Sequence, residues 1–177
     1  MNTVSNQHKK DAVKAFKFAI ISISTSRYEK YGSGTSPVGA DDISGKIMMD
    51  LVEENGHNLV DYCLVSDEMS AIKEAVTEAI LKGADIVITT GGTGLTPSDV
   101  TIESIVPMFE KQMPGFGELF RYKSTEQIGP AVMLTRADAG IMGGSAVFCL
   151  PGSPGAVELA LSKIILPEVG HIIKHIR

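Results

Sequence analysis

The chain has 177 residues, enough for one domain that buries roughly 70% of its unfolded surface, so no second domain is required. Its hydrophobic fraction of 44%, its mean hydropathy of +0.13 and its mixed charges are typical of a soluble globular protein and disfavour disordered and membrane proteins. The net charge of −5 and the lack of a basic stripe with aromatic residues argue against general nucleic-acid binding.

The first residues differ in composition from the rest of the chain. Residues 1–15 are polar without an apolar run, so they resemble neither a signal peptide nor a membrane span. We expect a flexible N-terminal tail over residues 1–15 and a single domain over residues 16–177. Cys63 and Cys149 each lie in an apolar run, which favours buried thiols in a reducing cytoplasm over a disulfide.

Four short apolar segments are predicted to be strands, and they cover residues 16–24, 58–66, 84–90 and 145–152. The first is followed by residues 25–40, whose Gly, Ser and Pro content predicts a long loop. Helical spacing of apolar residues predicts helices from Asp41 to Gly56, from about Ile72 to Gly83, from about Asp99, around residues 115–127, and over 155–176 with an interruption near Pro167.

Apolar strands that alternate with amphipathic helices predict an α/β fold, doubly wound, with a mostly parallel sheet covered by helices on both faces. In such sheets ligands bind outside the carboxyl ends of the strands. The loops after Ser24, Ser66, Thr90 and Leu150 would gather at that edge.

The loop after the third predicted strand reads "TTGGTGLTPSDVT", from Thr89 to Thr101. Gly91, Gly92 and Gly94 can adopt positive φ and bring backbone N–H groups close to an anion such as phosphate. A Walker A loop would end in Gly-Lys-Ser/Thr, and a dinucleotide fingerprint would have glycine where Pro97 stands, so neither motif fits. The alternative is a tight strand-to-helix connection in which Asp99 is only the helix cap.

Other loops of this edge carry related features. "LPGSPGAV", from Leu150 to Val157, again runs from a strand into a Pro-Gly turn, with a hydroxyl at Ser153. Asp67 opens the helix after the second strand, so Asp67 and Asp99 would be two hard oxygen ligands for Mg²⁺ on one rim, unless both are only caps. His171 and His175 are four residues apart, but without a third ligand nearby we interpret them as solvated cations at a helix C-terminus.

Four ordered motifs, "TTGGTGLTPSDVT", "MPGFGE" (Met113 to Glu118), "TRADAG" (Thr135 to Gly140) and "LPGSPGAV", resemble those of the MoaB/MogA family of molybdenum-cofactor biosynthesis proteins. The resemblance runs from about Phe16 to the C-terminus and includes "DDISG" (Asp41 to Gly45). It is closer to MoaB, because of "DDISG" and the N-terminal extension.

The resemblance implies a three-layer molybdopterin-binding domain that transfers AMP from Mg-ATP to the terminal phosphate of molybdopterin. It implies catalytic and metal-binding roles for Asp67 and Asp99, and a homotrimer or homohexamer. It assigns substrate binding to two loops and the end of the first strand, namely to Ser24, Gly91, Gly92, Thr93, Gly94, Gly152, Ser153 and Pro154.

Relatives often carry an acidic residue where this chain has Thr25, which weakens the case for a carboxylate in the first loop. Arg27 and Arg121 are candidate anion contacts, although each also suits an ordinary surface position. Two alternatives stay open: a protein that binds molybdopterin without catalysis, and a CinA-like nucleotide pyrophosphatase. The latter usually has Gly-Gly-Leu-Gly and paired aspartates, whereas this chain has Thr93 and the single Asp99.

Overall fold

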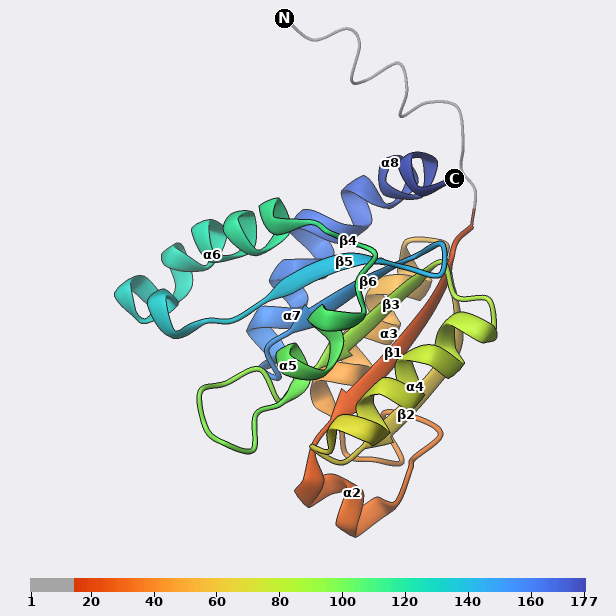
Figure 1. Ribbon diagram of the computed structural model, residues 1–177, viewed down its shortest axis with the longest axis vertical. Helices are drawn as coiled ribbons and strands as arrows, with labels where there is room; N and C mark the ends of the chain where they lie inside the picture. Colours follow the sequence, from red (N-terminus) through yellow and green to blue (C-terminus); the bar gives the residue numbers. More distant parts are fainter. Residues whose placement is uncertain (1–14) are drawn as a thin grey trace, which may run out of the picture.

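The computed structural model describes residues 15–177, in which six strands form one sheet (Figure 1). The strand order is β2-β1-β3-β6-β5-β4. The bounds are β1 Lys17–Ile23, β2 Asn58–Val65, β3 Ile86–Thr90, β4 Lys111–Gln112, β5 Asp138–Met142 and β6 Ser145–Leu150. Strands β2, β1, β3 and β6 run parallel, and β5 and β4 are antiparallel additions at one side.

Helices surround the sheet. They are α2 Thr25–Tyr31, α3 Ile43–Glu54, α4 Met69–Leu81, α5 Thr101–Ile105, α6 Pro114–Ile128, α7 Pro154–Ala160 and α8 Leu166–Ile176, with 3₁₀ turns η1 Val106–Met108 and η2 Gly129–Leu134 and a π-helical turn η3 Leu161–Ile165. The predicted tail lies outside the described residues, apart from Ala15. Within residues 15–177, no helix combines the length and the apolar character needed to cross a membrane.

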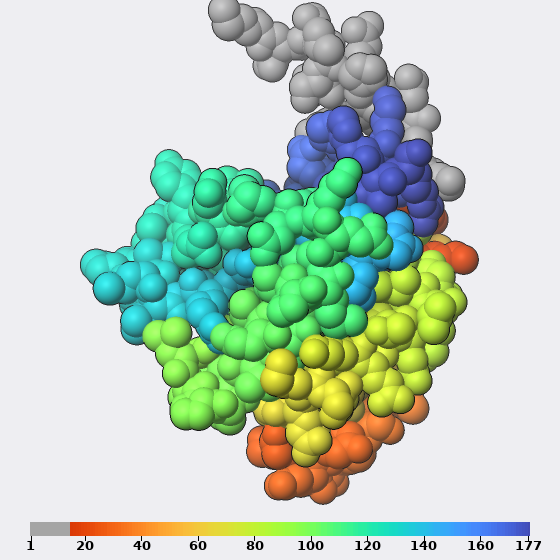
Figure 2. All heavy atoms as spheres, viewed as in Figure 1, coloured from red at the N-terminus to blue at the C-terminus, as the bar shows by residue number. Residues whose placement is uncertain are grey.

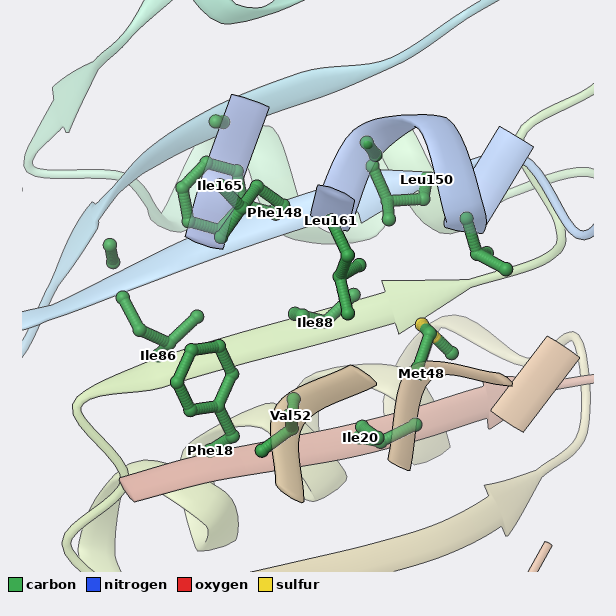
Figure 3. Close-up of a cluster of buried hydrophobic side chains, with 14 of the residues drawn as sticks. Phe18, Ile20, Met48, Val52, Ile86, Ile88, Phe148, Leu150, Leu161 and Ile165 are labelled. Atoms are coloured by element: carbon green, nitrogen blue, oxygen red, sulfur yellow. The ribbon is translucent and has the colours of Figure 1, made fainter. Parts of the chain in front are cut away.

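The core forms two layers, one on each face of the sheet. Alternate residues of a strand point to opposite faces. Phe18 and Ile20 of β1 belong to a cluster that includes side chains of α3, α6, α7 and α8, and they lie beside Met48 and Val52 of α3 (Figure 3). Ala19 and Ile21 belong to a cluster with side chains of α4 and α5. Both sets of side chains are buried, which explains why the parallel strands read as continuous apolar runs. The predicted three-layer α/β fold is confirmed.

The prediction of a long loop over residues 25–40 is wrong at its start, because α2 occupies Thr25–Tyr31. This segment contains neither glycine nor proline, and the helix ends where Gly32 adopts a φ of 66°. No α2 residue is buried, so the helix shows no apolar stripe by which its sequence could be recognised.

Strands β4 and β5 were not predicted. Strand β4 has only two residues, and β5 contains Gly140, whose Cα faces the ring of Phe109 so closely that a Cβ would collide with it. The hairpin from β5 to β6 turns through Gly143 and Gly144, both with positive φ. The predicted interruption near Pro167 is the π-helical turn η3, which directly precedes α8 and connects it to α7.

Candidate functional site

The carboxyl ends of β1, β2, β3 and β6 lie along one edge of the sheet, because these four neighbouring strands are parallel. The loops after Ile23, Val65, Thr90 and Leu150 therefore gather there, as predicted. The loop after β3, Gly91 to Val100, is called the glycine loop below.

The glycine loop begins with two positions that only glycine can occupy. Gly91 has a φ of 98° and Gly92 a φ of 61°. A Cβ at Gly91 would collide with the carbonyl oxygen of Ile23, and one at Gly92 would collide with the Thr101 hydroxyl. The bare backbone expected from the sequence is thus required by close packing as well as by conformation.

The carbonyl groups of the glycine loop are held by side chains and backbone outside it. The Thr101 hydroxyl donates to the Gly91 carbonyl (2.8 Å) and the Thr101 N–H to that of Gly92 (2.9 Å). The Nε of Arg136 donates to the carbonyl of the buried Thr93 (2.9 Å). Within residues 15–177, the N–H groups of Gly92 and Thr93 donate no hydrogen bond, so they are free to meet an anion.

Asp99 lies at the far end of this loop and does not cap the next helix, because α5 begins at Thr101 with Val100 as its N-cap. Its Oδ2 accepts the hydroxyl (2.6 Å) and the N–H (3.0 Å) of Thr96. Both bonds lower the pKa of Asp99, and the bond from the Thr96 hydroxyl has the larger effect. A Cβ at Gly94 would lie 2.6 Å from the same Oδ2, so Gly94 makes room for the carboxylate.

Asp67 does not cap α4, whose N-cap is Glu68. Oδ2 of Asp67 accepts hydrogen bonds from the N–H and the hydroxyl of Thr25 (2.8 Å each), and the N–H of Asp67 donates to the Thr25 hydroxyl (3.0 Å). A Cβ at Gly92 would lie 2.9 Å from Asp67 Oδ1. The carboxylates of Asp67 and Asp99 thus lie against the same segment, at Gly92 and at Gly94. The alternative interpretation of each aspartate as only a helix cap is wrong.

Thr25 stands where the resemblance led us to expect an acidic residue, and it contacts Asp67 instead. Its hydroxyl both donates to and accepts from Asp67, and so fixes the orientation of that carboxylate. Ser24, at the end of β1, is the N-cap residue of α2, and its Oγ lies 3.4 Å from that of Ser26.

The loop after β6, Pro151 to Ser153, packs directly on the glycine loop. A Cβ at Gly152 would lie 3.3 Å from the Cα of Gly91. Ser153 is the N-cap of α7, with its Oγ 3.4 Å from the N–H of Ala156, and Pro154 is the first residue of that helix. A cavity of about 170 Å³ between α6 and α7 opens beside Ser153.

The "DDISG" motif supports this second loop. Asp42 caps α3 by accepting the Gly45 N–H (2.9 Å), and its other oxygen accepts the Tyr62 hydroxyl (2.9 Å). Burial, together with the neighbouring Asp42 charge, raises the pKa of Tyr62. The Ser44 hydroxyl donates to the Gly152 carbonyl (2.8 Å), so the motif anchors the loop after β6.

Arg136 was not singled out from the sequence, although it lies in the "TRADAG" motif. Besides the Thr93 carbonyl, Arg136 contacts the Asp99 carbonyl (3.5 Å). Its guanidinium also forms a two-point ion pair with Glu103 of α5. This ion pair lowers the pKa of Glu103. Neither Arg27 nor Arg121 forms a hydrogen bond with the glycine loop in the part of the chain that the structure describes.

Comparison with known proteins gives consistent relatives. Residues 19–171 match the family described as "Probable molybdopterin binding domain". The chain is 41% identical to molybdenum cofactor biosynthesis protein B of Bacillus subtilis, over 97% of this chain and 96% of the relative. It is 46% identical to a molybdopterin adenylyltransferase of Pyrococcus furiosus, over 97% of each chain. The crystal structure of the tungsten cofactor synthesizing protein MoaB from Pyrococcus furiosus superimposes with a TM-score of 0.81 at 44% identity, over 94% of this chain and 99% of that one.

Proposed function

This chain belongs to the family of molybdopterin-binding domains of molybdenum cofactor biosynthesis, and on that premise we propose that it transfers AMP from Mg-ATP to the terminal phosphate of molybdopterin. The observation that carries this proposal is the glycine loop itself. Its carbonyl groups are occupied by Thr101 and Arg136, while the N–H groups of Gly92 and Thr93 have no partner within the described residues.

Unpaired backbone N–H groups beside glycines suit the phosphates of a nucleotide. Helix α5 is too short to contribute much of a dipole, so the anion affinity rests on these N–H groups rather than on the helix that the sequence suggested. We assign the nucleotide phosphates to Gly91, Gly92, Thr93 and Gly94, and a second contact to Ser24, Gly152, Ser153 and Pro154.

The carboxylates beside the loop fit a magnesium ion. Mg²⁺ is usually held by one or two carboxylates together with substrate phosphates and water, which matches Asp67 and Asp99 beside an anion site. Thr25 bonds to Oδ2 of Asp67, and Oδ1 accepts no hydrogen bond within residues 15–177. In this proposal Asp67 and Asp99 hold Mg²⁺, which supplies positive charge to the phosphates when it is bound.

The transfer makes one bond and breaks one. An oxygen of the terminal phosphate of molybdopterin attacks the α-phosphorus of ATP, and the bond from that phosphorus to the oxygen bridging the β-phosphorus breaks. Pyrophosphate leaves with the electron pair, and no side chain is modified. The protein has to position two anions and stabilise the charge that develops, which N–H groups and carboxylate-bound metal can do.

Two alternatives make different predictions. A protein that binds molybdopterin without catalysis would retain the pterin and release no pyrophosphate. A CinA-like pyrophosphatase would hydrolyse nucleotide derivatives without forming an adenylylated pterin. The two carboxylates beside the glycine loop favour transfer over simple binding, and the single aspartate after Thr93 favours it over the pyrophosphatase.

The decisive experiment is to incubate the purified protein with molybdopterin, Mg²⁺ and ATP, and to detect the adenylylated pterin and pyrophosphate. We expect both products in equal amounts, and neither when molybdopterin is omitted. Pyrophosphate or AMP without the adenylylated pterin would support the pyrophosphatase instead.

We further propose that the protein is a cytoplasmic homotrimer or homohexamer. Large apolar side chains stand exposed on α6 and η2, namely Leu119, Tyr122, Ile128, Met133 and Leu134. Met133 is 82% exposed, so its apolar surface would be covered by contact with a second copy. Light scattering at micromolar concentration tests this, and a monomer mass would contradict it.

A further inference from the structure

The last helix brings two imidazole rings together. His171 and His175 lie one turn apart on the same face of α8, and their Nε2 atoms are 2.9 Å apart. The ring centroids are separated by 4.6 Å with an interplanar angle of 69°, so the rings are inclined edge to face and approach each other at their Nε2 atoms.

The two Nε2 atoms lie at hydrogen-bonding distance from each other. Two protonated imidazoles would each present an N–H, and neither could accept the bond across the 2.9 Å gap. In the hydrogen-bonded pair, one Nε2 accepts the bond, so its lone pair faces the other ring. A lone pair held in this position is what a metal ion requires of histidine.

Glu168, one turn earlier, assists the same geometry. Its Oε2 lies 3.4 Å from Nδ1 of His171. A carboxylate near this nitrogen favours the tautomer with hydrogen on Nδ1, which leaves the lone pair on Nε2. Histidines that ligate metals generally have such a partner on their other nitrogen.

From this cluster we propose that His171 and His175 form a two-point chelate for a divalent transition metal ion. With metal–nitrogen bonds of about 2.0–2.1 Å, the observed separation of 2.9 Å corresponds to an angle of about 90° at the ion. That angle suits neighbouring ligands in the tetragonal geometry of Cu²⁺ or Ni²⁺ better than the wider angle of a tetrahedral Zn²⁺ site.

The surroundings leave room for the rest of the coordination shell. The rings border a cavity of about 200 Å³ whose other walls are Met113, Ile141, Ile172 and Ile176. His171 is 59% exposed, so water can reach the ion. Within residues 15–177 no cluster of three or more His, Cys, Asp and Glu side chains is placed to hold a metal, so water completes the shell.

The site is separate from the glycine loop. Helix α8 ends at the opposite edge of the sheet, where Arg177 bonds to Asp85, the residue just before β3. Figure 2 shows α8 in dark blue at the top of the molecule and the glycine loop in light green at its lower left. Metal binding here is therefore independent of the proposed transfer of AMP.

The test is calorimetric titration of the untagged full chain with NiCl₂, because Ni²⁺ binds imidazole and does not oxidise thiols. We expect one ion per chain. The apparent Kd should rise by at least about tenfold in both His171→Gln and His175→Gln, because even the loss of an outer hydrogen-bond partner typically costs that much. Lys174→Gln is the matched control, since it removes a charge from the same turn without removing a nitrogen ligand.

Unchanged Ni²⁺ affinity in the His171→Gln/His175→Gln double variant would overturn the proposal, as would the absence of binding by the wild-type chain at millimolar Ni²⁺. An equal loss in Lys174→Gln would also overturn it: removing a positive charge should not weaken the binding of a cation, so the loss would reflect a general change in the helix. AMP transfer by His175→Gln should equal that of the wild type, so failure of the transfer assay and failure of this proposal are distinguishable.

Discussion

The glycine loop after β3 and the loop after β6 leave neighbouring parallel strands and meet at Gly91 and Gly152, but they continue differently. The loop after β6 passes at once into α7, and Ser153 caps that helix. The glycine loop instead extends to Val100, and its carbonyl groups depend on Thr101 and Arg136 for their partners.

The difference lies in which polar side chains lie against each loop. In the loop after β6, a side chain of the loop itself serves the next helix. In the glycine loop, the carboxylates of Asp67 and Asp99 lie against the backbone of Gly92 and Gly94. In our proposal the glycine loop therefore binds the nucleotide phosphates, and the loop after β6 supports it and supplies a secondary contact.

The largest effect is expected from Gly92→Val, which should abolish measurable ATP binding. The new side chain would collide with the Thr101 hydroxyl, crowd Asp67 and occupy a left-handed conformation that costs about 1–2 kcal/mol. Calorimetric titration with Mg-ATP measures the loss, and circular dichroism should show that the fold is retained.

Gly152→Ala is the matched control on the other loop. Its Cβ would sit 3.3 Å from Gly91, a tight contact that a small shift relieves, so ATP affinity should fall much less than in Gly92→Val. If Gly92→Val bound ATP as the wild type does, the phosphate site would have to lie elsewhere.

Asp99→Asn should lower the rate of AMP transfer by about a hundredfold while ATP and molybdopterin still bind, since the lost charge matters most as pyrophosphate leaves. Asp67→Asn should behave similarly. Single-turnover rates and melting temperatures distinguish a catalytic role of Asp99 from a structural one. Transfer at the wild-type rate would mean that Asp99 only shapes the loop.

The lowered pKa of Asp99 also predicts a pH dependence. A carboxyl whose folded pKa lies below its unfolded value adds stability above that value, 3.8, and loses it as the pH falls through the folded pKa. The stability difference between wild type and Asp99→Asn should therefore be constant near neutral pH and shrink below about pH 4. Urea unfolding from pH 7 to pH 3 measures it, and a difference independent of pH would exclude a contribution from this ionisation.

A smaller effect is expected from Arg136→Lys, which keeps the charge but loses the two-point pair with Glu103 and the bond to the Thr93 carbonyl. Because the pair is partly exposed, we expect a cost of about 1 kcal/mol, or roughly 2–4 °C in Tm. ATP affinity should fall together with the Tm, since the glycine loop loosens. Unchanged Tm and affinity would show that Arg136 does not order the loop.

Ser153→Ala should have the smallest effect. Its capping bond is long, at 3.4 Å, so we expect a loss of about 0.5 kcal/mol in stability, the low end for an N-cap. If Ser153 also contacts the substrate, as proposed, affinity should drop several-fold in addition. Wild-type affinity combined with the small stability loss would restrict Ser153 to capping α7.

Sequence patterns were sufficient for the architecture and for the position of the loops. Continuous apolar runs such as that of β3 identified the parallel strands, and helical stripes such as that of α4 identified the covering helices. Positive φ at Gly91 and Gly92 was foreseen because few residues other than glycine adopt it. Local pattern failed for α2 and β4, which are exposed and short, and so carry no periodic apolar signal.

The sequence by itself determined the layered α/β fold and the glycine turn, because periodicity and glycine conformation are local properties of the chain. Only the tertiary structure decided what the polar side chains do. Asp67, which precedes α4, bonds to Thr25, and Arg136 reaches the carbonyl of Thr93, across separations of 42 and 43 residues. Such bonds depend on which strand ends the sheet places side by side, and no local pattern encodes that choice.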